Sequence, residues 1–540
     1  MKKGDVVTLD IVDQGMNGEG IAKLDGFTLF ADYLLKGERA EAEITHVKKN
    51  FAFAKAKKII RMSEDRVRPV CPLFKKCGGC DLQHMSYDSQ LALKREIVVN
   101  CLKKAGVKAG VSPVVPSDLR LEYRNKLQLP FGTGKDGVVL GFYKKESHSV
   151  VPLDGCPLHG EWAAELIRTV KNWARKFSFT AYDETDRTGE LRHLVARKTP
   201  DGISVVIVAN AKKGRHLDEL YDALSEKFGK VGVYFSSNTR NTNVVMDNVR
   251  FVKGTESRIS PLAFMQVNDN VTGKIYKALS DAFDGEDTVI DAFSGTGVLT
   301  AELAEKAGKA YGIEIVPEAV AAADAAIREK GLKNVTNLCG DCAEVLPRLV
   351  AGLISEKPAV HKMNLQKAPF NKIKSGAKTY ELRLADEKRA KVKSGDYILF
   401  EDDDGNALTV RVKGKTEFAG FRQLFESLGT EKTTGEQISA DMAVKITDLY
   451  YPPEKQEKYR ALAIEIERAD LPSESGIAVV LDPPRKGCDD SVLQAVVQSG
   501  ADKVFYISCN PATLARDLKT LCEVYNIDRV TPFDMFPQTR

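Results

Sequence analysis

From about Asn268 onward, short apolar runs alternate with amphipathic stretches, and this alternation constrains the fold more than any other feature of the chain. Five runs have the length and the aliphatic content of buried strands: DTVIDAF, AYGIEI, NVTNLCGD, IAVVLDPP and KVFYIS. Helical stretches separate most of them. Strands that alternate with helices predict an α/β fold, namely a doubly wound parallel sheet of the Rossmann-like type.

One interval in this alternation is too long. The residues between NVTNLCGD and IAVVLDPP far exceed the needs of one crossover helix. They contain β-like segments of their own: DYILFED, LTVRVKGKTEF, MAVKITDLYY and ALAIEIE. We therefore predict a separate β-rich domain at 357–470, which divides the parallel-sheet domain into 268–356 and 471–540.

The N-terminal half reads differently. Residues 1–60 form short alternating runs separated by glycine turns, a pattern typical of a small OB-like barrel. Residues 61–267 begin with a cysteine-rich loop, continue with a helix expected from about Tyr87 to Ala105, and then become a mixed β-rich region. We predict a central domain there.

Composition limits the cellular setting. No apolar run is long enough to span a membrane, and the start MKKGDVVTLDIVDQG lacks the apolar core of a signal peptide. Ten cysteines in 540 residues do not make a disulfide scaffold and favour metal binding or catalysis in a reducing compartment. We expect a cytoplasmic monomer with no membrane partner.

A basic segment points to a polyanionic partner, although the net charge is only +4. From Lys48 to Arg68 the chain has eight Lys or Arg and two acidic residues, with Phe51 and Phe53 among them. Cations interleaved with aromatic rings suit a nucleic-acid backbone and its bases. A solvated sheet edge is the alternative.

The stretch DAFSGTG, from Asp291 to Gly297, lies directly between a predicted strand and a helix. Its glycines, Gly295 and Gly297, let a ligand approach the backbone. Glu314 ends the next strand, where a carboxylate can accept hydrogen bonds from ribose hydroxyls, and Asp341 ends the third, at the expected adenine rim. Because Thr300 stands where a dinucleotide motif has its third glycine, the pattern favours S-adenosylmethionine over a nicotinamide cofactor.

Two further stretches end strands at the same expected edge. LDPPRKGC places Asp482 and Arg485 there, because its two prolines stop the strand. VFYISCNPATLARD places Cys509 at a strand-to-helix turn. Carbon 5 of a pyrimidine is too weak a nucleophile to take a methyl group directly, and a thiolate that adds to carbon 6 removes this obstacle. A base must then remove the proton from carbon 5.

In this order, SPLAFMQVN, DAFSGTG, GIEI, GD, LDPPRKGC and SCNPATLARD resemble the RNA uracil-5-methyltransferases, above all the bacterial enzymes that act on 23S ribosomal RNA. The resemblance implies a class I methyltransferase fold, an N-terminal TRAM barrel that binds RNA, and Cys509 as the nucleophile. It also implies a set of residues that line the S-adenosylmethionine site: Gln266, Phe293, Glu314, Asp341 and Asp482.

Four cysteines form the candidate metal site: Cys71, Cys77 and Cys80 in CPLFKKCGGC, and Cys156 in LDGCPLHG. A zinc ribbon normally has two C-x-x-C pairs, whereas only one is present here, and four irregularly spaced thiolates suit a [4Fe–4S] cluster. The family places such a cluster at these positions. Zinc and unliganded thiols are the alternatives, and we interpret the second C-x-x-C, CGDC, as packing residues.

The predicted insertion contains GAKTYELR, which resembles the G-x-K-x-x-E-x-R pattern of ASCH domains, small PUA-like barrels. The resemblance implies that Lys378, Glu381 and Arg383 line a cleft. An additional RNA-gripping module is the interpretation we favour; an amidohydrolase-like activity and an inert charged helix end are the alternatives.

The chain departs from the family pattern at its end. The family continues past DMFPQT with His-x-Glu, whose glutamate is the base, and with a last strand, whereas this chain reads DMFPQTR and stops at Arg540. The base is therefore not identified among these residues, and a chain that is complete in this form should resolve its RNA adduct slowly. The hypotheses are methylation of 23S ribosomal RNA, methylation of transfer RNA, and a non-catalytic RNA-binding or assembly factor.

Overall fold

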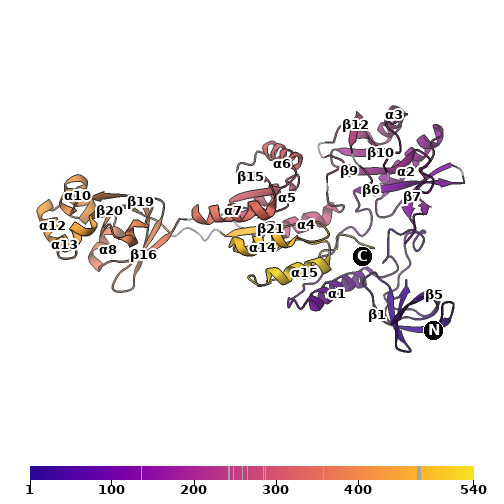
Figure 1. The fold of residues 1–540 in the computed structure, drawn as a ribbon, viewed down its shortest axis with the longest axis horizontal. Helices are drawn as coiled ribbons and strands as arrows, with labels where there is room; N and C mark the ends of the chain where they lie inside the picture. The colour runs from indigo at the N-terminus through magenta and orange to yellow at the C-terminus, as the bar shows by residue number, and fades with distance from the viewer. Residues whose placement is uncertain are drawn as a thin grey trace.

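Four β-sheets, each in its own folded unit, make up the strand content of the part of the chain that the structure describes (Figure 1). The structure is a computed structural model of residues 1–540, described except at 136, 241–243, 247, 258–259, 264, 284, 286, 357, 471–475 and 540. No helix among the described residues combines the length and the apolar character that a membrane span requires.

The first sheet, which we call the barrel unit, is closed. Its strands alternate buried and exposed positions because each has one face toward the interior. They are β1 (Val6–Gln14), β2 (Gly20–Leu24), β3 (Phe27–Asp32), β4 (Arg39–Val47) and β5 (Phe51–Arg61), in the order β1-β2-β3-β5-β4. Pairing of β1 with β4 closes the barrel, as the glycine-punctuated sequence predicted.

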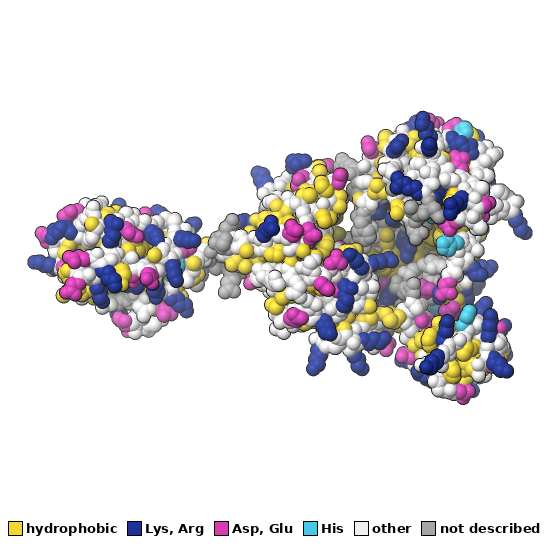
Figure 2. All heavy atoms as spheres, in the orientation of Figure 1, with side chains coloured by type: hydrophobic (Ala, Val, Ile, Leu, Met, Phe, Trp, Pro, Cys, Tyr) yellow, Lys and Arg dark blue, Asp and Glu magenta, His cyan; other side chains and the backbone are white. Residues whose placement is uncertain are grey.

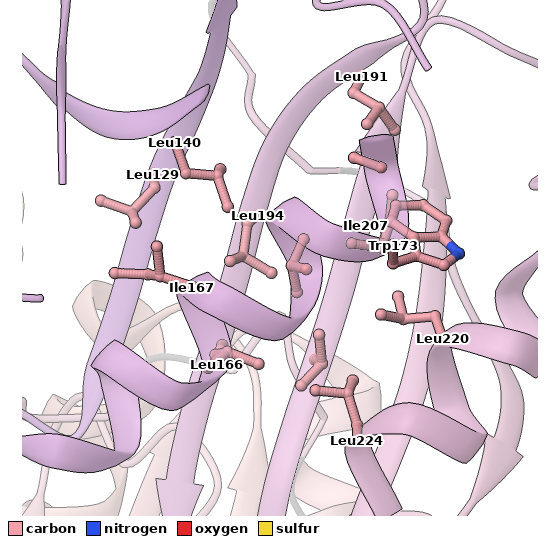
Figure 3. Packing of buried hydrophobic residues seen from close by; sticks show 14 of the residues in the cluster. Leu129, Leu140, Leu166, Ile167, Trp173, Leu191, Leu194, Ile207, Leu220 and Leu224 are labelled. Atoms are coloured by element: carbon pink, nitrogen blue, oxygen red, sulfur yellow. The ribbon is translucent and has the colours of Figure 1, made fainter. Parts of the chain in front are cut away.

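The central unit follows α1 (Tyr87–Ala105), whose bounds agree with the prediction because Ser86 caps its start and Gly106, in a left-handed conformation, ends it. Its sheet runs β12-β11-β10-β9-β6-β7-β8. The strands are β6 (Lys126–Gly134), β7 (Gly137–Tyr143), β8 (Val150–Pro152), β9 (Leu191–Thr199), β10 (Gly202–Ala209), β11 (Val231–Ser237) and β12 (Val249–Gly254). Figure 3 shows Ile167 and Trp173 of α2 (Glu161–Lys176) and Leu220 of α3 (Leu217–Phe228) among the buried residues of this core.

The parallel-sheet unit has the predicted doubly wound fold, with strand order β15-β14-β13-β21-β22 and every pair parallel. The strands are β13 (Thr288–Asp291), β14 (Lys309–Glu314), β15 (Val335–Cys339), β21 (Ile477–Leu481) and β22 (Lys503–Tyr506). The helices are α4 (Asp269–Ser280), α5 (Val298–Ala304), α6 (Pro317–Lys330), α7 (Cys342–Glu356), α14 (Asp490–Ser499) and α15 (Pro511–Leu521). The strand order reverses between β13 and β21, and this is where open α/β sheets bind ligands.

The inserted unit follows α7 and lies at one end of the molecule, beyond the parallel-sheet unit (Figure 1). Its sheet runs β16-β18-β19-β20-β17. The strands are β16 (Val360–Asn364), β17 (Tyr380–Leu384), β18 (Tyr397–Glu401), β19 (Ala407–Phe418) and β20 (Ala461–Arg468). The helices are α8 (Lys367–Lys374), α9 (Glu387–Ala390), α10 (Phe421–Leu428), α11 (Thr430–Thr434), α12 (Ala440–Asp448) and α13 (Pro453–Tyr459).

One sequence-based prediction in this unit is wrong, and one alternative is excluded. The segment MAVKITDLYY, expected to be β-like, lies largely in α12, because Ser439 accepts a hydrogen bond from the backbone of Met442 and caps a helix that buries Ala443. The charged run of GAKTYELR enters strand β17 and is not a helix end.

Candidate active site

A cleft opens at the carboxyl edge of the parallel sheet, and seven positions selected from the sequence line it: Gln266, Phe293, Gly295, Glu314, Asp482, Arg485 and Cys509. They come from the ends of β13, β14, β21 and β22 and from the segment before α4. Figure 2 shows the molecule hollowed where the parallel-sheet unit faces the two N-terminal units. Residues such as Asn17 of the barrel unit and Arg124 of the central unit also line this cleft.

The glycine loop leaves room for a ligand. Gly295 has a φ of +53°, and a Cβ added there would meet nothing within 4 Å, so the backbone is open to the cleft. Glu314 accepts hydrogen bonds from the backbone N–H groups of Gly295 at 3.0 Å and Val316 at 2.9 Å. A carboxylate has about four acceptor sites, so Glu314 retains capacity for ribose hydroxyls. This arrangement fits S-adenosylmethionine.

Asp291 and Gly297 are placed differently from the cleft-lining group. Asp291 is 1% exposed and accepts hydrogen bonds from the Thr300 hydroxyl at 2.7 Å and the Phe293 N–H at 3.4 Å. Burial raises the pKa of its carboxyl to about 7, opposed by the Thr300 hydrogen bond and reinforced by Asp482. A Cβ at Gly297 would lie 2.7 Å from the Cβ of Ala323, so this glycine serves helix packing.

Asp341 is exposed and lies at the start of α7, where its Oδ1 accepts from the Ala343 N–H at 2.8 Å. Among the described residues that line the cleft, Asp291, Gly297 and Asp341 are not found. Asp291 bonds to Thr300 of α5, Gly297 packs against the middle of α6, and Asp341 bonds to the start of α7.

Asp482 ends β21 and faces the cleft while it is largely surrounded by protein, and burial raises its pKa to about 6. Tyr276 on α4 lines the same cleft, and its pKa is raised by burial and by the neighbouring Asp482 and Asp291. Both pKa values are raised chiefly because the two side chains lie in a part of the cleft wall that water reaches poorly. Carboxyl groups with shifted pKa values in a cleft are typical of functional sites.

Cys509 is exposed in the turn between β22 and α15. Ser508 accepts a hydrogen bond from the Asn510 N–H at 3.1 Å, and Asn510 caps α15 by accepting from the Ala512 N–H at 3.0 Å. Pro511 occupies the first helical position, where its missing N–H leaves no hydrogen bond unmade. The polar residues around the thiol therefore build the turn that presents it to the cleft.

The four candidate metal-binding cysteines converge on a second, small cavity of the central unit: Cys71, Cys77, Cys80 and Cys156. The Gly79 N–H donates to Cys77 Sγ at 3.4 Å, and Gln83 Nε2 donates to Cys80 Sγ at 3.2 Å. Burial raises the pKa of Cys80 to about 12. Among the described residues, no three His, Cys, Asp or Glu side chains form a group suited to holding a metal ion.

In the inserted unit, Lys378, Glu381 and Arg383 lie together; that they line a cleft stays a prediction. Lys378 Nζ donates to Glu381 Oε2 at 2.8 Å, and Arg383 Nε lies 2.9 Å from Glu381 Oε1. Burial opposes the charge of Arg383, but Glu381 and Tyr451 hold its pKa above the usual value. One carboxylate thus stands between two buried cations.

Sequence reasoning missed the segment from Val530 to Phe536, which lines the cleft. It runs beside residues 111–115, and the buried carboxylate of Asp534 accepts hydrogen bonds from the Tyr87 hydroxyl at 2.8 Å and from Lys94 Nζ at 2.5 Å. Both donors are on α1, remote in sequence, so only the Asp within an apolar run could have signalled this contact.

The comparisons with known proteins divide the chain in a similar way. Family models match as a TRAM domain (1–57), a methyltransferase domain (283–394), an ASCH domain (363–470) and a tRNA (uracil-5-)-methyltransferase (454–540). An uncharacterized RNA methyltransferase of Clostridium tetani is 31% identical over 557 residues, covering 100% of this chain and 95% of its own. One from Halalkalibacterium halodurans is 31% identical over 558 residues, covering 100% and 96%.

Among solved structures, the tRNA (uracil-54, C5)-methyltransferase of Pyrococcus abyssi in complex with S-adenosyl-L-homocysteine is 20% identical, with a TM-score of 0.60 over 99% of this chain and 97% of that one. At this identity the likeness concerns the fold. The parallel sheet, its glycine loop and its cleft define a class I methyltransferase that uses S-adenosylmethionine. The chain belongs to the RNA uracil-5-methyltransferase family and carries an inserted ASCH domain.

Proposed function

We propose that this methyltransferase acts on carbon 5 of a uridine in 23S ribosomal RNA through a covalent adduct with Cys509. The observation that carries the proposal is the position of this thiol. It is exposed at the carboxyl end of β22 and lines the same cleft as Glu314 and Asp482. A uridine that enters the cleft meets the nucleophile beside the methyl-donor site.

Bound S-adenosylmethionine supplies an electrophilic methyl group. The Cys509 thiolate adds to carbon 6 of the uracil, which forms a C–S bond and moves the ring electrons toward carbon 5. Carbon 5 takes the methyl group, and S-adenosylhomocysteine leaves with the electron pair of the broken S–CH3 bond. A base removes the proton from carbon 5, whereupon the C5–C6 double bond returns and the thiolate departs.

The carbon-6 adduct gives a direct experiment. RNA in which 5-fluorouridine replaces uridine has no proton to lose at carbon 5, so the adduct should accumulate and survive denaturing electrophoresis. Peptide mass spectrometry should find the nucleotide on Cys509. Cys509→Ala should give neither adduct nor methyl transfer, whereas Cys522→Ala, which changes another exposed cysteine at the far end of α15, should retain both. Undiminished methylation by Cys509→Ala would refute the covalent route.

For the four-cysteine cavity we infer a [4Fe–4S] cluster. The support is that all four cysteines line one cavity and that two of them already accept N–H hydrogen bonds, which stabilise cluster-bound thiolates. Such a cluster would cross-link the loop of Cys71 to that of Cys156 and supply a redox-active centre. Iron and sulfide analysis of protein purified without oxygen tests it, and Cys80→Ser should lose both.

The choice of ribosomal RNA rests on the resemblance of the motifs. Transfer RNA is the alternative, because the matched family model and the Pyrococcus abyssi relative bear the names of tRNA enzymes. Incubation with tritiated S-adenosylmethionine and unmodified total RNA, followed by mapping of 5-methyluridine, separates the two. Label in neither RNA would favour a non-catalytic RNA-binding factor.

A further inference from the structure

A buried carboxylate links the two segments that carry Asp482 and Cys509. Asp517 lies on α15, and its side chain is fully buried. Its Oδ2 accepts hydrogen bonds from the Tyr506 hydroxyl at 2.5 Å and from the Cys488 N–H at 2.8 Å. Tyr506 ends β22 just before the turn of Cys509, and Cys488 ends the loop that begins at Asp482.

Arg516 extends this link. Its Nε donates to Asp517 Oδ1 at 2.7 Å, and its Nη2 donates to the carbonyl oxygens of Lys486 at 2.9 Å and Cys488 at 3.1 Å. The neighbouring turn adds weaker contacts, since Asn510 and Thr513 approach the carbonyl oxygen of Arg485 at 3.5 and 3.4 Å. The loop is therefore held through its backbone, at both an amide and several carbonyls.

The loop has the shape that this contact requires. Gly487 has a φ of +81°, and a Cβ added there would lie 2.4 Å from Asp517 Oδ2 and 2.6 Å from Arg516 Nη2. Only a glycine lets the peptide approach the carboxylate so closely. A hydrogen-bonded buried charge holds its partners in a single geometry. An amide in its place would keep one acceptor oxygen and set a donor NH2 against the donors that met the other oxygen.

We propose that Asp517, with Arg516, is a positioning residue that fixes the Cys509 thiol relative to the methyl donor beside Asp482. The inference rests on the proposed covalent function and adds a determinant of its rate. Neither side chain is among the described residues that line the cleft, so both act through the loop and the turn. A displacement of reacting atoms by about 1 Å can cost roughly 100-fold in rate.

The test measures single-turnover adduct formation with 5-fluorouridine RNA in the full-length protein, together with the Kd values for RNA and for S-adenosylhomocysteine. Asp517→Asn keeps the shape of the side chain and removes its charge. Glu523→Gln is the matched control, because it neutralises an exposed carboxyl just beyond the same helix. Tyr506→Phe removes a single donor and leaves the carboxylate bonded to Cys488 and Arg516.

For Asp517→Asn we expect adduct formation to slow by about 30- to 100-fold, with both Kd values close to those of the unmodified chain. The melting temperature should fall, because the amide cannot satisfy the buried donors of Tyr506, Cys488 and Arg516. Tyr506→Phe should slow it by about 3- to 10-fold, and Glu523→Gln should change nothing. A well-folded Asp517→Asn variant that forms the adduct at the native rate would overturn the proposal. If Asp517→Asn does not fold, adduct formation by Tyr506→Phe at the native rate would overturn the proposal. Failure of the unmodified chain to form any adduct would instead refute the proposed function.

Discussion

The parallel-sheet unit and the inserted unit both bury a carboxyl group, but they surround it with opposite kinds of neighbour. Asp291 is bonded to a neutral hydroxyl and a backbone N–H, and its pKa is raised to about 7. Glu381 lies between the cations of Lys378 and Arg383. Burial therefore works against the charge of the first carboxyl, whereas two cations face the second.

This difference follows from the groups that surround each carboxyl. A carboxyl that can hold a proton stabilises the loop after Asp291 without placing a full charge beneath it. The Glu381 site holds two cations in place by burying an anion between them. Four substitutions test how these two units differ in the groups that stabilise them.

The largest effect is expected for Glu381→Gln. The amide leaves the cations of Lys378 and Arg383 buried and uncompensated, so the inserted unit should lose roughly 3–5 kcal/mol of stability. Hydrogen exchange read by mass spectrometry should show faster exchange in β17 and β20, with exchange in β13 and β21 unchanged. Equal acceleration in both units would contradict the separate burial of the two carboxyls.

Asp291→Asn should change the pH dependence of the parallel-sheet unit. The raised pKa means that the native carboxyl contributes stability that is present below its unfolded pKa, near 4, and is lost as the pH rises toward 7. The asparagine variant lacks this loss, so its stability relative to the native chain should rise by roughly 2–3 kcal/mol between pH 5 and 7. Hydrogen exchange of β13 at the two pH values measures this, and a pH-independent difference would show that Asp291 does not titrate there.

Thr300→Val should have a smaller effect of the same kind. The variant removes the hydroxyl that donates to Asp291 Oδ2 and should cost about 1–2 kcal/mol. Because this hydrogen bond lowers the pKa of Asp291, its loss should move the titration of the unit upward. Thr300→Ser, which keeps the hydroxyl, serves as the control and should retain the native titration.

The smallest effect is expected for Arg422→Ala in the inserted unit. Its ion pair with Asp441 spans 2.7 Å, but both side chains are more than half exposed to solvent. Water screens such pairs, so exchange rates in the inserted unit should not change measurably. A marked acceleration of hydrogen exchange would show that this surface pair stabilises the inserted unit as much as the buried cluster of Lys378, Glu381 and Arg383 does.

The sequence predicted those helices and strands whose ends are marked by nearby residues, such as caps, glycines and turns. Helix α1 could be bounded because a serine cap and a terminal glycine mark its ends, and the five parallel strands because each is a short apolar run between turns. In α12, the helix prevails over a β-like composition because Ser439 caps it and tertiary packing buries Ala443. The Ser439 cap is a local signal that the β-like composition obscured, whereas the burial of Ala443 depends on tertiary packing.

The same distinction applies to the candidate site: some of its features could be predicted from nearby residues and others could not. Glycines and strand-end acids revealed the cleft, because parallel strands must end at one edge. The sequence could not show that Asp291 faces inward to Thr300, since both orientations are compatible with a strand end. Nor could it show that Asp517 contacts both Tyr506 and the Cys488 N–H, because hydrogen bonds between distant segments leave no periodic trace.

The insertion also has a consequence for how the protein is made. Asp287, just before β13, accepts a hydrogen bond from Gly476, 189 residues further along the chain. During synthesis β13 therefore emerges long before β21, its partner on one side, and must wait with an open apolar edge while the whole inserted unit is translated. A compact insert that folds by itself in that interval would keep the waiting strand from pairing with the wrong chain.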